Sequence, residues 1–166
     1  TGLDGMEVDV LGGKHNLTDV NAVIGIHQLK QLPELMKQRQ TLAQHYFTCF
    51  KKTSLIEQGL ELPMEDFLHS NWHMFQVVLP IEKLNQLGMN RATVMQKLKD
   101  MNIGTGVHYP LISDFKLYQE LGYNSDQTPV AQRVGSAILT LPLFPLMTTF
   151  DVERVVHALQ LILQEI

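Results

Sequence analysis

The 166-residue sequence contains a single cysteine, Cys49. One cysteine excludes an intrachain disulfide, so a reducing, cytoplasmic compartment is the expected location. Its neighbours Tyr46, Phe47 and Phe50 are aromatic. This setting favours a small buried side chain over a reactive nucleophile.

Long apolar runs and clusters of positive charge are also missing. No stretch reaches the roughly 18 apolar residues of a membrane-spanning helix, and residues 1–5 do not resemble a signal peptide. The 13 lysines and arginines are scattered among 17 acidic residues, which gives a net charge of −4. We therefore expect no membrane partner and no nucleic-acid partner. Because the chain begins with Thr1, we expect a fragment of a longer protein.

Hydrophobic residues make up 45% of the chain, enough for a substantial core. From Thr18 they recur at helical spacing, which predicts a long helix over residues 18–51. Pro33 lies inside this stretch. Since proline removes a backbone hydrogen bond, we expect a kink or break near Gln31 and Leu32.

The remaining pattern alternates strands and helices. Three stretches rich in apolar residues precede prolines and predict strands, and residues 6–10 suggest one further short strand. The predicted strands are 72–79, 105–109 and 138–141, and the predicted helices are 90–101, 115–121, 129–137 and one starting near Thr148. A sheet of three strands covered by helices, behind a long leading helix, is an α+β (α/β layered) domain.

Seven histidines raise the question of a metal site. His69 and His73 have the spacing of a helical ligand pair, but they lie in a predicted loop and strand without a third ligand nearby. We therefore predict no metal site.

Two segments place polar groups where a ligand could bind. His108 and Tyr109 end a predicted strand, although a surface histidine and a core tyrosine would also fit this position. Asn16 precedes the long helix, at an end where backbone N–H groups favour an anion. It could equally serve as a turn or cap residue.

Three segments occur in a characteristic order: Lys14-His15-Asn16-Leu17-Thr18-Asp19-Val20-Asn21-Ala22-Val23-Ile24-Gly25, then Ile103-Gly104-Thr105-Gly106-Val107-His108-Tyr109, then Leu141-Pro142-Leu143-Phe144-Pro145. Together they resemble the C-terminal half of the sugar-nucleotide aminotransferases, which are pyridoxal 5'-phosphate (PLP) enzymes of fold type I. The resemblance implies the small C-terminal domain of that fold, with a mainly antiparallel three-stranded sheet. It also implies a remnant of the large cofactor-binding domain over 1–17, an interdomain helix over 18–51 and the small domain over 52–166.

The resemblance further implies a dimeric enzyme that moves an amino group from glutamate to a nucleotide-linked keto-sugar. It is strongest to enzymes that aminate a UDP-4-keto-pentose for 4-amino-4-deoxy-L-arabinose, a lipopolysaccharide component. The family's Schiff-base lysine lies upstream of these segments, so we expect no catalytic residue in this chain and no activity without its N-terminal domain. A dehydratase of the same family and a free-standing noncatalytic module that binds a sugar nucleotide or a protein remain alternatives.

Residue by residue, the resemblance assigns Asn16 to the PLP phosphate of the neighbouring subunit. It assigns His108 and Tyr109 to the substrate side of the cleft, with Trp72 and His73 as further candidates for the same wall. His15 and Leu146 depart from the residues that the family and its closest subgroup usually have there, so the identity of the sugar stays open.

Overall fold

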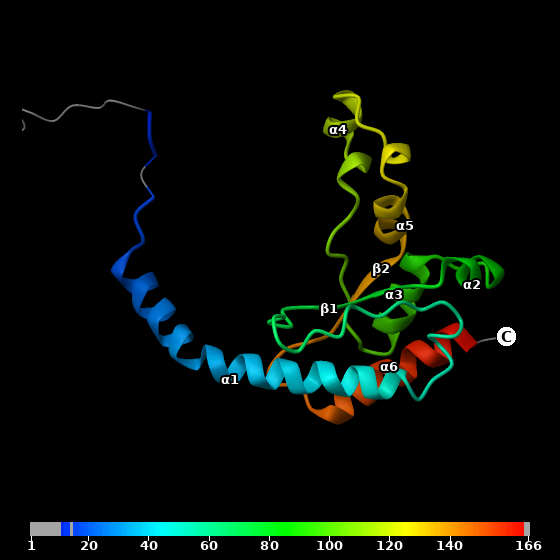
Figure 1. The fold of residues 1–166 in the computed structure, drawn as a ribbon, viewed down its shortest axis with the longest axis horizontal. Helices are drawn as coiled ribbons and strands as arrows, with labels where there is room; N and C mark the ends of the chain where they lie inside the picture. Colours follow the sequence, from blue (N-terminus) through cyan, green and yellow to red (C-terminus); the bar gives the residue numbers. More distant parts are fainter. Residues whose placement is uncertain (1–10, 14, 165–166) are drawn as a thin grey trace, which may run out of the picture. The chain divides into compact units, whose positions relative to one another are not determined.

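The computed structural model describes residues 11–13 and 15–164. It divides within its first helix into two units, Thr1–Pro33 and Glu34–Ile166. The short strand expected over 6–10 lies outside the described residues. The elements are α1 (Asp19–Phe50), β1 (Phe75–Val78), α2 (Ile81–Gln86), α3 (Arg91–Asp100), α4 (Lys116–Glu120), α5 (Pro129–Ala137), β2 (Ile138–Leu141) and α6 (Thr149–Gln164), with 3₁₀ turns at Ile112–Asp114 and Ser125–Gln127 (Figure 1).

The long helix α1 confirms the prediction for residues 18–51. Pro33 lies inside it, and helical structure continues on both sides, so the helix does not break near Gln31 and Leu32. The kink expected there stays a prediction. A proline removes a single N–H donor, and the remaining hydrogen bonds of a long helix can continue around it. Within the described part of the chain, neither α1 nor another helix is long and apolar enough to cross a membrane.

The sheet differs from the prediction, because the described residues form two strands and not three. β1 and β2 pair antiparallel, with Phe75 opposite Leu141 and Val78 opposite Ile138. The third predicted strand, 105–109, contributes only one bridge, between Gly106 and Thr140. Two glycines weaken strand structure there, and Pro110 has no N–H group with which to extend the ladder.

Alternation along the two strands separates a core face from a second face. Phe75 and Val77 of β1 and Leu139 and Leu141 of β2 are buried in the core. The residues between them, Gln76 and Thr140, are direct cross-strand partners and point to the other face. This second face is the one that carries the candidate site.

The core lies between the sheet, the second half of α1 and α6. Tyr46 and Phe50 of α1 are fully buried, and the Tyr46 ring stacks on Phe75 with 4.5 Å between ring centroids. The Tyr46 hydroxyl donates a 2.8 Å hydrogen bond to the carbonyl of Pro142. α6 contributes a buried stripe at helical spacing: Val152, Val155, Val156, Leu159, Ile162 and Leu163.

Two helix starts follow the sequence signals. Asn90 caps α3, because its side chain accepts a hydrogen bond from the Thr93 N–H at 3.0 Å. Thr148 and Asp151 form a reciprocal cap at the start of α6. The Asp151 carboxylate accepts from the Thr148 N–H at 2.8 Å, and the Thr148 hydroxyl accepts from the Asp151 N–H at 3.3 Å.

Other helix starts lack a side-chain cap. Ser113 and Asp114 belong to a 3₁₀ turn, and α4 starts after them without a capping hydrogen bond. Thr128 precedes Pro129, the first residue of α5, and its side chain makes no capping bond. The short helix α2 was not predicted, because six residues are too few to show a clear period.

Candidate functional site

The candidate site centres on His108, whose side chain and backbone are held by both strands. The imidazole Nδ1 lies 2.9 Å from the Thr140 hydroxyl oxygen of β2. The Gln76 side chain of β1 donates a hydrogen bond through Nε2 to the backbone carbonyl of His108. Gln76 and Thr140 are paired neighbours on the two adjacent strands. Gln76 holds the backbone of His108 and Thr140 holds its ring.

Gly106 makes room for the imidazole. A Cβ at this position would lie 2.7 Å from Cε1 of the His108 ring, closer than side chains normally approach. The glycine backbone also forms two hydrogen bonds with Thr140, of 3.1 and 2.8 Å. The His108 ring therefore lies directly against Gly106, the residue that pairs with Thr140 of β2.

Tyr109 lies next to His108 and extends outward. Its ring meets the imidazole edge to face, with centroids 5.2 Å apart, and the peptide bond between the two residues is cis. The side chain is 69% exposed. Tyr109 thus stands at the border between the sheet and the pocket beside it.

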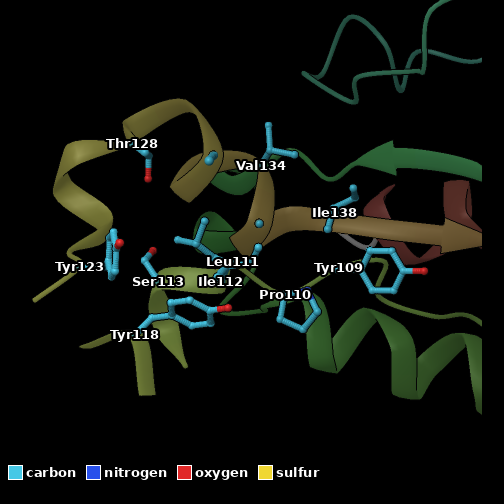
Figure 2. A pocket seen from close by; sticks show the side chains of 12 residues that line it. Tyr109, Pro110, Leu111, Ile112, Ser113, Tyr118, Tyr123, Thr128, Val134 and Ile138 are labelled. Atoms are coloured by element: carbon cyan, nitrogen blue, oxygen red, sulfur yellow. The ribbon is translucent and has the colours of Figure 1, made fainter. Parts of the chain in front are cut away.

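A cavity of about 680 Å³ opens beside Tyr109, between the 110–113 segment, the α4 region and α5. Figure 2 shows Tyr109 and Tyr123 at opposite ends of it, with Tyr118 and Ser113 between them. The Ser113 hydroxyl oxygen is buried and has no hydrogen-bond partner. The lining residues are Tyr109, Pro110, Leu111, Ile112, Ser113, Tyr118, Tyr123, Thr128, Ala131, Val134, Gly135 and Ile138.

The chemistry of this lining is apolar and aromatic, with a few hydroxyl groups. Aromatic rings offer flat, weakly polar surfaces, and hydroxyls can donate or accept hydrogen bonds. None of the described lining residues carries a charge. The pocket therefore suits an uncharged, flat or apolar part of a ligand, oriented by a small number of hydrogen bonds.

The structure places Trp72 and His73 elsewhere. Trp72 is 3% exposed and packs against Phe47, Phe67 and Phe75, so it belongs to the core. Its indole Nε1 has no hydrogen-bond partner. His73 is exposed, and its backbone carbonyl accepts a 3.0 Å hydrogen bond from Arg39. Both residues precede β1, and neither lines the pocket.

Asn16 is exposed and lies three residues before α1, in the unit Thr1–Pro33. The first turn of the helix is capped by Thr18, whose hydroxyl accepts a 3.4 Å hydrogen bond from the Asn21 N–H. The helix start therefore does not use Asn16 as its cap, which leaves the side chain available for another partner.

Sequence reasoning missed Gln76 and Thr140, the two residues that hold His108. A signal was present, since each is the single polar residue in an otherwise apolar strand, Phe75–Val78 and Ile138–Leu141. Thr140 is only 8% exposed. A buried polar side chain in a strand requires a partner, and this requirement points to a nearby polar group.

Solved structures share this fold at low sequence identity. PseC of Helicobacter pylori, an aminotransferase involved in the biosynthesis of pseudoaminic acid, matches with a TM-score of 0.80 and 22% identity, over 96% of this chain and 41% of its own. DesV of S. venezuelae, solved with a ketimine intermediate, gives 0.79 and 21% over 95% and 40%. Spr1654 of Streptococcus pneumoniae, solved in a PLP form, gives 0.76 and 21% over 90% and 36%. The chain thus spans about two fifths of the length of these proteins.

At these identities the structures establish the fold alone. The sequence itself carries the family assignment, because residues 2–160 match one family almost from end to end. The match includes both Asn16 and the His108–Tyr109 segment. The chain belongs to the DegT/DnrJ/EryC1/StrS aminotransferase family.

Proposed function

We propose that this chain is the C-terminal part of a PLP-dependent aminotransferase that moves an amino group from glutamate to a nucleotide-linked keto-sugar. The family match over residues 2–160 is the observation that carries the proposal. The chain's coverage of only 36–41% of the solved proteins supports the view that it is one part of a larger protein. On this proposal the parent protein is a dimer.

The proposed division assigns residues 1–17 to the large domain, 18–51 to an interdomain helix and 52–166 to the small domain. Apolar side chains on the first half of α1 are exposed, which supports the view that another part of the parent protein packs on this helix. Val20, Val23 and Leu29 are 72%, 66% and 66% exposed. Such an apolar helix face is stable in water when another surface packs on it, and the large domain or the second subunit would supply that surface.

The residues described here do not form a complete PLP site. A fold-type-I site requires a lysine for the Schiff base, an acidic partner for the ring nitrogen and donors for the phosphate. The lining of the pocket beside Tyr109 contains neither a lysine nor an acidic residue. On this proposal Asn16 is the residue of this chain that contacts the cofactor, as a donor to the phosphate held by the neighbouring subunit.

His108 and Tyr109 are the proposed substrate-contacting residues. The bonds from Thr140 and Gln76 hold the His108 ring and backbone in one orientation, as a binding side chain requires. Tyr109 and the uncharged pocket beside it offer a surface for a sugar or base, and not for a phosphate. Contact of Trp72 and His73 with the substrate stays a prediction, and the burial of Trp72 gives it no support.

The proposed substrate is a UDP-4-keto-pentose, and the proposed product pathway leads to 4-amino-4-deoxy-L-arabinose of lipopolysaccharide in the cytoplasm. This finer assignment rests on the sequence resemblance alone. Leu146, where the closest subgroup has an acidic residue, is 90% exposed and lies outside the pocket lining. Its departure from the subgroup therefore leaves the pocket unchanged.

The test is a kinetic assay of the parent protein, expressed with the sequence that precedes Thr1. We expect glutamate-dependent amination of a nucleotide-linked 4-keto-sugar, and a His108→Ala variant with a KM raised at least tenfold. His69→Ala is the matched control, because His69 is exposed and lies outside the pocket.

Other results would overturn the proposal. Dehydration of the sugar without amino transfer would assign the parent to the dehydratases. Binding of the sugar nucleotide without turnover, by a parent that holds no PLP, would assign it to the noncatalytic modules. If His108→Ala has unchanged kinetics, His108 does not contact the substrate, but the proposed reaction still stands.

A further inference from the structure

Three potential metal ligands, from helices α1 and α6, lie close together. His45 and Cys49 lie one turn apart on α1, and Glu153 lies on α6. The His45 Nε2 atom is 3.0 Å from Glu153 Oε1. The ring nitrogen, the thiol sulfur and the carboxylate oxygen all lie within 4.8 Å of one another.

The core holds these three residues in place. All three belong to the unit Glu34–Ile166, so one packed body sets their spacing. Tyr46 and Phe50 are fully buried beside the two ligands of α1, and Val152 is fully buried beside Glu153. The backbone positions therefore follow from packing and do not depend on an ion.

An ion pair alone accounts for only part of the cluster. His45 and Glu153 can form an ion pair without a metal, but that pair does not involve the sulfur of Cys49, which lies within 4.8 Å of both ligand atoms. A bound divalent cation would involve all three groups, because a coordinating thiol loses its proton to form a thiolate and the cation attracts both the thiolate and the carboxylate.

The donor set matches a particular class of ion. Imidazole nitrogen, thiolate sulfur and carboxylate oxygen are the three groups that bind Zn²⁺, at about 2.0–2.3 Å from the ion. Tetrahedral geometry then requires ligand atoms about 3.3–3.8 Å apart. The most distant pair therefore has to approach by about 1–1.5 Å, while the imidazole nitrogen and the carboxylate oxygen, now 3.0 Å apart, separate slightly. The Glu153 side chain is 56% exposed and can make this movement.

We infer that His45, Cys49 and Glu153 bind one divalent transition-metal ion, with zinc as the best match, and that the ion joins α1 to α6. The solvent-exposed side of the cluster leaves the fourth position to water. Sequence spacing does not reveal this site, because the third ligand comes from a helix more than a hundred residues away. The site is separate from His108 and the pocket, so its role is structural.

The test uses the purified, reduced and metal-free chain. We expect one equivalent of Zn²⁺ to bind in calorimetric titration and one equivalent of Co²⁺ to give a thiolate-to-cobalt charge-transfer band. His45→Ala, Cys49→Ser and Glu153→Gln should each weaken binding at least tenfold, and Cys49→Ser should remove the band. His27→Ala, an exposed histidine on the same helix, is the control and should bind like the unmodified chain.

A thermal measurement separates loss of metal from loss of fold. Zn²⁺ should raise the melting temperature of the unmodified chain and leave that of Cys49→Ala unchanged, while circular dichroism shows that the metal-free variant is folded. The inference is overturned if no stoichiometric binding occurs, if Cys49→Ser keeps full affinity, or if bound cobalt shows no thiolate band.

Discussion

Nδ1 of His108 lies 2.9 Å from the hydroxyl oxygen of Thr140, a residue 32 positions later in the chain. His108 is a candidate site residue from the sequence, whereas Thr140 is identified by the structure alone. Through this contact the imidazole has one ring nitrogen committed to the sheet. On the proposed function, the other nitrogen is the one available to a ligand.

Replacing Thr140 with valine removes the hydroxyl and keeps the shape of the side chain. The net value of one hydrogen bond is about 1 kcal/mol, which corresponds to about a fivefold rise in the KM for the sugar nucleotide. Steady-state kinetics of the parent enzyme measure this change. Thr48→Val on the exposed face of α1 is the control, and an unchanged KM in Thr140→Val would mean that the contact does not position the ring.

Gly106→Ala should also displace the His108 ring, through a steric clash and not through the loss of the hydrogen-bonding partner Thr140. The new methyl group would lie 2.7 Å from Cε1 of His108, and the imidazole can rotate away more easily than the backbone can move. We expect the chain to stay folded while the nuclear Overhauser contacts between His108 and Thr140 disappear. Gly104→Ala should preserve them, because no atom lies within 4 Å of its added methyl group.

Tyr46→Phe tests a buried hydrogen bond. The Tyr46 hydroxyl donates to the Pro142 carbonyl at 2.8 Å, and burial of the phenol raises its pKa, so the group stays protonated. Phenylalanine would keep the ring packing but leave the carbonyl without this donor, which costs about 1–3 kcal/mol. Urea unfolding measures the difference. Tyr123→Phe, at a residue 58% exposed, should have a much smaller effect, and equal losses in both variants would contradict the assignment.

Asp66 should make the chain's stability depend on pH in the acid range. Its carboxylate accepts hydrogen bonds from the backbone N–H groups of Leu68 and His69, both at 2.9 Å, and the His69 bond is the largest cause of its lowered pKa. A pKa lowered by folding stabilises the folded state above the ordinary aspartate range, near 3.9, and this stabilisation is lost as the pH falls through the folded pKa.

The stability difference between the unmodified chain and Asp66→Asn should therefore shrink as the pH is lowered from neutral to about 3. Chemical denaturation at a series of pH values measures it, with the exposed Asp114→Asn as the control. A difference that stays constant across this range would contradict the role of the charged carboxylate.

The first half of α1 should drive self-association of the isolated chain. Ile26 and Leu29 are 55% and 66% exposed on an apolar helix, and such patches associate in water. We expect a concentration-dependent increase in mass by sedimentation equilibrium, reduced by the double variant Ile26→Lys with Leu29→Lys. Lys30→Glu changes charge nearby without removing apolar surface and should leave association intact. A strict monomer at all concentrations would refute the prediction.

Local signals accounted for most of the helices. The apolar period of α1, the Asn90 cap of α3 and the reciprocal cap at Thr148 and Asp151 are all written in short stretches of sequence. The sheet was predicted less well. Residues 105–109 have strand-like composition, yet only Gly106 pairs, because strand formation depends on a partner's hydrogen bonds as much as on local preference.

The sequence by itself determined the family, through three motifs in order, and the positions of the main helices, through spacing that repeats every few residues. The tertiary structure alone decided which side chains meet. It brought Gln76 and Thr140 to His108, moved Trp72 into the core and placed Glu153 beside His45. The physical reason is that periodicity acts between near neighbours in the chain, whereas these contacts depend on how distant segments pack.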